Sequence, residues 1–99
     1  MTLPVVWIPE ADADLGEALG WYEDIHPDLG LRFALAVDAA VEAIAKSPLR
    51  YQILHRGIRR TGVKRFPYGL FYKVESERIV VIACMHGQRD PRRWKLRPH

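Results

Sequence analysis

Residues 78–86 (RIVVIACMH) form an apolar run that does not alternate between apolar and polar positions. A strand with apolar side chains on both faces belongs in the centre of a sheet, because each face must be covered. The run passes directly into the cationic stretch HGQRDPRRW, residues 86–94. The chain must therefore build a sheet around this strand. The cationic stretch is then either a solvated tail or a working surface to which the strand delivers His86 and several arginines.

The N-terminal half predicts one strand and two helices. Residues 3–8 are apolar and rich in β-branched side chains, which predicts a short strand. Pro9 is followed by acidic residues, which favours a helix from there to about His26, because proline suits the first helical position and acids meet the positive dipole end. Pro27 opens a second helix, whose apolar residues recur at helical spacing until Pro48. The short turn between them predicts an antiparallel helical hairpin.

The C-terminal half predicts β-structure. Residues 47–57 are expected to form a loop, and strands are expected at 58–66, 68–75 and 78–86. The fold class is therefore α+β, with the order β-α-α-β-β-β and a helical hairpin packed on one face of a small antiparallel sheet. The other face would be left free. Residues 1–99 are expected to form a single domain, given this length.

Charge divides the chain in two. Residues 1–48 hold two basic and nine acidic residues, a net charge of −7, whereas residues 49–99 hold thirteen basic and three acidic ones, a net charge of +10. A strongly basic half attracts nucleic acid or an acidic protein.

Composition points to the compartment. No apolar run approaches the roughly 18 residues that suggest a membrane span. The acidic N-terminal segment does not resemble a signal peptide. Cys84 is the single cysteine, and a lone thiol suits a reducing compartment. We therefore expect a cytoplasmic protein with no membrane contact.

The basic residues of the C-terminal half are interleaved with aromatic ones, a combination that suits phosphates and stacked bases. Within residues 58–66, even positions such as Arg60 share one face of the strand, opposite Arg59. The residues expected to bind a target or nucleic acid are Arg59, Arg60, Lys64, Arg65, Tyr68, Arg89, Arg92 and Arg93.

A nuclease is a second hypothesis for the same surface. RNA cleavage needs a base, a cation for the phosphate and an acid for the leaving oxygen. If the chain is a nuclease, the catalytic set would be His86, Arg60 and Arg89. No metal site and no cofactor are expected, because one cysteine and four scattered histidines show no ligand spacing and no glycine-rich phosphate loop is present.

The segment VKRFPYGLFYKVESERIVVIACMHGQRDPRRW, residues 63–94, resembles the C-terminal signature of the RelE/ParE superfamily of bacterial toxins. The match is nearest to the ParE-like, plasmid-stabilisation branch. The segments IPEADADL and HPDLGLRFALAVDAAVEAIAKSPLRY resemble the two helices of that family and the residues after them. The fold that this resemblance implies agrees with the order of elements read from the sequence.

The resemblance implies the toxin component of a type II toxin–antitoxin system, neutralised by a cognate acidic antitoxin. Operator DNA would be bound only through the antitoxin. The cellular target would be DNA gyrase, as for characterised ParE members, with binding rather than catalysis as the mechanism. The alternatives are the ribosome and its mRNA, as for RelE-like endonucleases, and a degenerate toxin that retains only antitoxin binding.

By position, the RelE-like active surface would involve Arg60, Lys64 or Arg65, and His86. The sequence departs from the nuclease pattern in two ways. It has no tyrosine directly after His86 and no obvious catalytic carboxylate. These departures favour the binding inhibitor.

Overall fold

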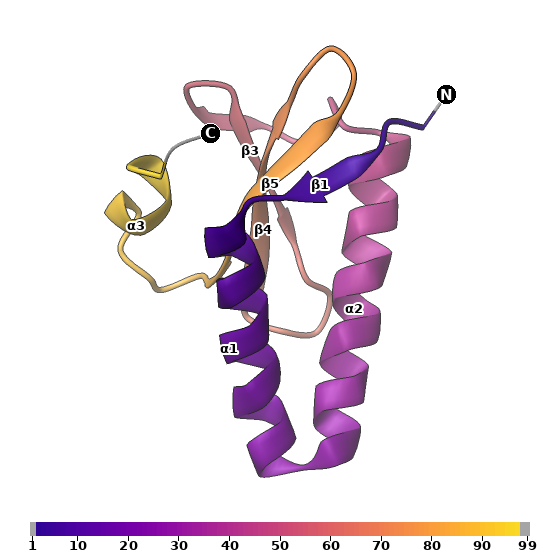
Figure 1. Ribbon diagram of the computed structural model, residues 1–99, viewed down its shortest axis with the longest axis vertical. Helices are drawn as coiled ribbons and strands as arrows, with labels where there is room; N and C mark the ends of the chain where they lie inside the picture. Colours follow the sequence, from indigo (N-terminus) through magenta and orange to yellow (C-terminus); the bar gives the residue numbers. More distant parts are fainter. Residues whose placement is uncertain (1, 98–99) are drawn as a thin grey trace.

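A helical hairpin lies against one face of a five-stranded sheet in the computed structural model, which describes residues 2–97. In Figure 1 the closed end of the hairpin projects beyond the sheet, and a short C-terminal helix lies on the other side. The elements, in chain order, are β1 (Val5–Trp7), α1 (Pro9–Ile25), α2 (Pro27–Lys46), β2 (Ile53–His55), β3 (Ile58–Gly62), β4 (Tyr68–Val74), β5 (Ile79–His86) and α3 (Arg92–Lys95).

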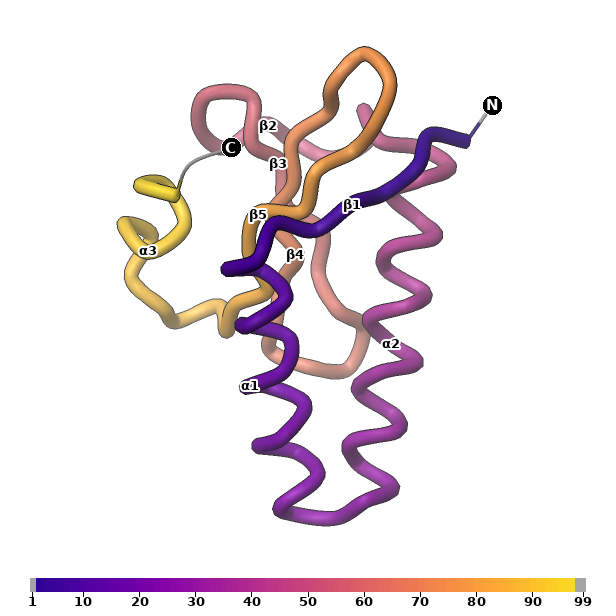
Figure 2. Tube along the Cα trace, in the orientation of Figure 1, coloured from indigo at the N-terminus to yellow at the C-terminus, as the bar shows by residue number. Residues whose placement is uncertain are grey.

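Both long helices begin at the prolines that predict them. Pro9 occupies the start of α1 and Pro27 the start of α2, where a missing N–H costs no helical hydrogen bond. His26 joins the two helices: its backbone N–H donates to the carbonyl of Tyr22, and its Nδ1 accepts from the N–H of Asp28 at 3.0 Å. One residue thus ends α1 and caps α2, and the tight hairpin of Figure 2 follows. The predicted helical hairpin is confirmed.

The strand order is β1-β5-β4-β3-β2, so β5 is central, as its two apolar faces predict. The sheet is mostly antiparallel, but β1 pairs parallel with β5, from Val5 opposite Ile79 to Trp7 opposite Val81. No tight turn joins these two strands, so nothing forces them to run antiparallel.

Two details of the sequence prediction are wrong. Residues 53–55 form β2 rather than loop, and pair with β3 across a turn in which Arg56 and Gly57 have φ of 45° and 81°. Glycine adopts this conformation readily, and the Arg-Gly pair is the hairpin signal that was missed. Strand β3 ends at Gly62, because the chain then turns through Arg65 at φ 71°. The tail after β5, for which no element was predicted, forms a short helix, α3.

The face of the sheet opposite the hairpin is partly covered, not free as predicted. Trp94 of α3 is buried and stacks on Phe71, with ring centroids 4.6 Å apart and an angle of 23° between the rings. It packs over the side chains of Ile58, Val80 and Ile82. The sheet therefore has a core on each side, and the cationic tail is held close to the end of β5.

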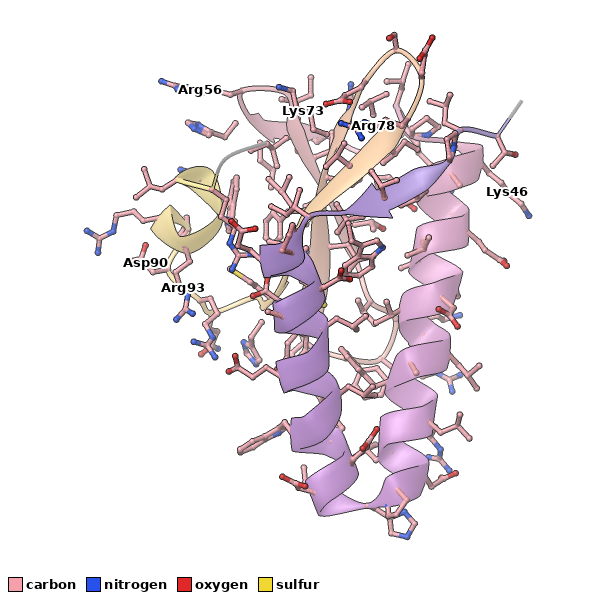
Figure 3. All side chains as sticks on the ribbon, viewed as in Figure 1. Lys46, Arg56, Lys73, Arg78, Asp90 and Arg93 are labelled. Carbon is pink, nitrogen blue, oxygen red and sulfur yellow. The ribbon has the colours of Figure 1, made fainter. Side chains whose placement is uncertain are left out.

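Figure 3 shows where charged side chains lie around this frame. Arg56, Lys73 and Arg78 lie at the end of the sheet away from the tip of the helical hairpin, and Arg93 lies beside α3. Between residues 2 and 97, no helix is both long enough and apolar enough to cross a membrane.

Candidate functional site

The candidate site begins where β5 ends. His86 is the last residue of β5 and pairs with Tyr68, the first residue of β4, with ring centroids 5.5 Å apart. The N–H of Gly87 donates to the carbonyl of Pro67 at 2.8 Å, which turns the chain away from the sheet. Arg89 follows on the surface. The pairing of β4 with β5 therefore places His86 and Arg89 together at the end of β5, which we call the corner of the sheet.

Arg60 reaches the same corner across the sheet. It lies on β3 opposite Phe71, and its guanidinium carbon is 5.8 Å from the centroid of that ring. The side chain then passes over Gly69, where an added Cβ would lie 2.4 Å from Nε. A cavity of about 200 Å³ results, lined by Arg60, Phe71, Met85, His86, Gly87, Arg89, Pro91 and Trp94. The structure thus brings together the three residues named for the nuclease hypothesis.

The absence of a side chain at Gly69 is what allows this path, so Gly69→Ala should disturb the site more than the fold. The new methyl would displace the guanidinium of Arg60, which is the far end of a flexible side chain. We expect the Tm to fall by only a few degrees, corresponding to about 1 kcal/mol, while the growth inhibition on expression that the resemblance to bacterial toxins implies falls about tenfold. Gly16→Ala is the control, because a Cβ there meets nothing within 4 Å. Equal toxicity of the two variants would contradict the role given to Arg60.

The hydrogen bond at His86 restricts its chemistry. Nδ1 accepts from the backbone N–H of Gln88 at 3.1 Å. A neutral imidazole that accepts at Nδ1 carries its proton at Nε2. Nε2 is therefore a hydrogen-bond donor in this arrangement, not a base. In this state Nε2 cannot take up a proton from a reacting group.

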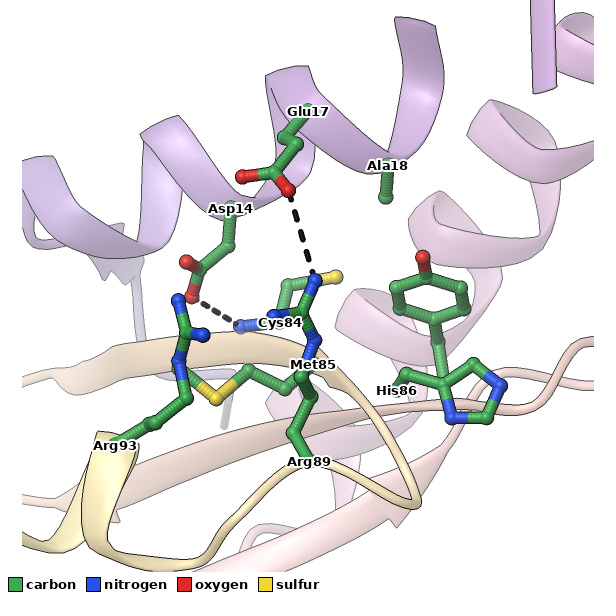
Figure 4. A pocket seen from close by; sticks show the side chains of 9 residues that line it. Asp14, Glu17, Ala18, Cys84, Met85, His86, Arg89 and Arg93 are labelled. Carbon is green, nitrogen blue, oxygen red and sulfur yellow. Dashed lines mark hydrogen bonds and ion pairs between the residues drawn. The ribbon is translucent and has the colours of Figure 1, made fainter. Parts of the chain in front are cut away.

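Two carboxylates of α1 line a second cavity that includes His86. Figure 4 shows Asp14 and Glu17 projecting from the helix toward Arg89 and Arg93, around a small cavity of about 30 Å³. Glu17 Oε1 lies 3.6 Å from Arg89 Nη2, and both side chains are largely exposed. An exposed pair of this kind contributes roughly 0–1 kcal/mol, so a ligand can take Arg89 from Glu17. The sequence signal for these acids was their spacing of three, which puts both on one face of the helix.

Burial keeps the neighbouring hydroxyl and thiol protonated. Tyr68 packs on an aromatic cluster with Tyr22, Phe33 and Phe66, and burial raises the pKa of its hydroxyl. Burial and then the charge of Asp14 raise the pKa of the Cys84 thiol to about 12. The thiol is therefore not a nucleophile at neutral pH.

Comparison with known proteins identifies the family. Residues 5–91 match the model of a family described as "ParE toxin of type II toxin-antitoxin system, parDE". The chain belongs to the ParE toxin family. It is 32% identical over 79 residues to "Toxin ParE2" of Mycobacterium tuberculosis, covering 79% of this chain and 75% of that protein.

Two solved structures share the fold of this ParE-family chain. One, titled "Chromosomal ParDE TA system from P. aeruginosa", has a TM-score of 0.75 at 17% identity and covers 86% of this chain and 96% of that one. The other is the toxin–antitoxin complex RelBE2 from Mycobacterium tuberculosis, with a TM-score of 0.59 at 23% identity, covering 87% and 92% of the two chains.

Three other residues that were predicted to bind a target lie away from the cavity formed by Arg60, His86 and Arg89. Arg59 faces the hairpin side of the sheet, where Nη1 donates to the carbonyls of Tyr51 and Leu49 and fixes the loop before β2. Lys64 and Arg65 lie in the β3–β4 turn, beside α2. None of these three residues lines a cavity that His86 lines.

Arg92 and Arg93 leave α3 in different directions. Arg92 is bound to Asp90, with 2.7 Å between Nη2 and Oδ2, and this bond holds the pKa of that carboxyl below its ordinary value. Arg93 lines the cavity near His86. Of the two, Arg93 is the one that joins the site.

Proposed function

We propose that this ParE-family toxin arrests bacterial growth by binding and inhibiting DNA gyrase, and that a small acidic antitoxin neutralises it. The observation that carries the proposal is the corner formed by Arg60, His86 and Arg89. Arg60 and Arg89 make a surface that holds an acidic partner, and a histidine whose Nε2 is a donor supplies no base for a reaction with it. Gyrase is the target that membership of the ParE family favours.

An mRNA endonuclease is the second candidate, and the same corner supports it. Arg60 and Arg89 would hold a phosphate, and Tyr68 keeps a protonated hydroxyl next to His86. Cleavage would need His86 to give up its bond to Gln88 or to change tautomer, since Nδ1 already accepts a hydrogen bond. This requirement ranks the nuclease below the binding inhibitor.

Expression of the chain in bacteria tests the proposal. We expect growth arrest, with plasmid DNA that becomes relaxed or cleaved while transcripts stay intact. Co-expression of the cognate antitoxin should restore growth. Transcripts cut at codon positions, with normal supercoiling, would instead support the nuclease. No growth arrest would contradict both, and would leave a degenerate toxin that only binds its antitoxin.

The antitoxin is proposed to bind a groove between α2 and the β3–β4 turn. The groove measures about 480 Å³, and exposed Leu35 together with Ala36, Ala39 and Phe66 gives it an apolar lining. Its charged residues are Arg32, Lys64 and Arg65, all basic. Small residues let a backbone approach closely, and the cations complement an acidic segment, so the groove suits an amphipathic acidic helix.

Replacing Leu35 by Glu should weaken antitoxin binding by at least tenfold while toxicity is retained, because the change puts an acid where an acidic segment docks. Leu31→Glu is a matched control: Leu31 lies on the same helix and is 58% exposed, against 59% for Leu35, but it does not line the groove. Calorimetric titration with the cognate antitoxin at two salt concentrations measures the effect. Equal affinities for the two variants, or binding that salt does not weaken, would argue against this groove.

A further inference from the structure

The pairing of β1 with β5 stops before β5 does. Trp7 lies opposite Val81, and the N–H of Ile8 donates to the carbonyl of Val81 at 3.1 Å. The chain then enters α1 at Pro9. The carbonyl of Ile82 and the N–H of Cys84 lie beyond this point, on an edge that β1 no longer covers.

An ion pair between distant parts of the chain completes this edge. Asp14 of α1 accepts the N–H of Cys84 at 3.1 Å, and Arg97, after α3, donates to the carbonyl of Ile82 at 2.9 Å. The two side chains also bind each other in a two-pronged arrangement, Arg97 Nη1 to Asp14 Oδ2 and Nη2 to Oδ1. Each side chain is only 14% exposed. The pair thus supplies an acceptor and a donor where a strand would have supplied them.

This ion pair also closes the cationic tail into a loop. The tail leaves β5 after His86 and is bound back to the same strand at Arg97. Trp94, stacked on Phe71, is a second anchor inside the loop. The bond to Asp14 raises the pKa of the Arg97 guanidinium above its ordinary value, so the charge of the anchor persists.

We propose that Asp14 and Arg97 are positioning residues for target binding, an inference that rests on the proposed function. Arg89 and Arg93 lie within the closed loop, and both line the cavity beside His86. Because the tail is already fixed at both ends, target binding does not have to order it. The conformational entropy cost of binding is therefore smaller. Neither positioning residue needs to touch the target.

Arg97→Gln tests the proposal, with three readouts on the purified chain. Amide hydrogen exchange of residues 87–97 should become at least tenfold faster. The concentration of chain that half-inhibits gyrase should rise about 10- to 100-fold, the loss expected when binding groups are misplaced. Affinity for the cognate antitoxin should stay within twofold, because the groove on α2 is a separate surface. Arg78→Gln is the control, since it removes one cation that pairs with Glu75 in the β4–β5 hairpin.

A second variant covers the case in which Arg97→Gln does not fold. Arg97→Lys keeps the charge but cannot bind both carboxylate oxygens and the Ile82 carbonyl at once. It should show an intermediate increase in tail exchange and an intermediate loss of inhibition. Unchanged tail exchange in both variants would overturn the proposal, as would full inhibition despite a fast-exchanging tail, or a parallel loss of antitoxin affinity.

The proposed function and the positioning role can fail separately. If the unaltered chain does not inhibit gyrase, the proposed function fails, while hydrogen exchange still reports whether Asp14 and Arg97 hold the tail. If the unaltered chain inhibits gyrase and Arg97→Gln does so equally well, only the positioning role fails.

Discussion

Substitution of Phe33 by alanine is expected to lower the free energy of unfolding by about 3–5 kcal/mol, the range for removing a fully buried aromatic ring. Phe33 is completely buried, and its ring centroid lies 5.0 Å from those of Tyr22 and Phe66 and 5.2 Å from that of Tyr68. It is the point at which α1, α2 and the β3–β4 turn meet. Because domains of this size are stable by roughly 5–15 kcal/mol, the variant would be close to unfolding at 37 °C.

Urea denaturation measures this effect. Leu31→Ala is the control on the same helix, because Leu31 is 58% exposed and should lose less than about 1 kcal/mol. A loss below about 1.5 kcal/mol for Phe33→Ala would mean that the aromatic cluster is not the centre of the hairpin core.

The second large effect is expected from the double variant Arg60→Gln, Arg89→Gln. Each charge-assisted hydrogen bond to a partner contributes about 1.5–3 kcal/mol, so losing two should reduce target inhibition by about 100-fold or more. His86→Ala should stay within about fivefold of the unaltered chain, because a binding inhibitor needs no proton transfer. Growth inhibition at graded expression levels, with protein amounts measured, compares the three chains.

The matched control removes the same charge elsewhere. Arg56→Gln with Lys73→Gln deletes two cations at the other end of the sheet (Figure 3) and should leave toxicity unchanged. Loss of toxicity by orders of magnitude in His86→Ala, in a chain that still folds, would contradict the binding mechanism and support the nuclease.

Much of the fold could be predicted because its signals are local. Pro9 and Pro27 mark the helix starts, and the apolar run in β5 marks the central strand. The parallel pairing of β1 could not be predicted in this way, since it joins residues more than 70 positions apart. Strand β2 was missed because Ile53 and Leu54 are about half exposed and show no alternation.

The candidate site was predicted in part, for a related reason. Alternation along β3 separates Arg60 from Arg59, and the register of the sheet then brings Arg60 to the corner of His86 and Arg89. Sequence alone treated Arg59 as one more cation of the surface, whereas its bonds to loop carbonyls depend on how the α2–β2 connection folds.

Two contributions to the site were not predictable from local patterns. Asp14 and Arg97 are 83 residues apart, and each reads as an ordinary solvated charge in its own segment. The path of Arg60 over Gly69 becomes visible only when the strands are in register. Both depend on contacts between elements, which composition and periodicity do not encode.

Purified chain added to DNA gyrase, with relaxed plasmid and ATP, is the most direct measurement of the central claim. The proposed function predicts that the chain blocks supercoiling or traps cleaved DNA, that His86→Ala does the same, and that the Arg60→Gln, Arg89→Gln double variant does not. Full gyrase activity at a large molar excess of folded chain, together with cleavage of ribosome-bound mRNA that His86→Ala abolishes, would contradict it.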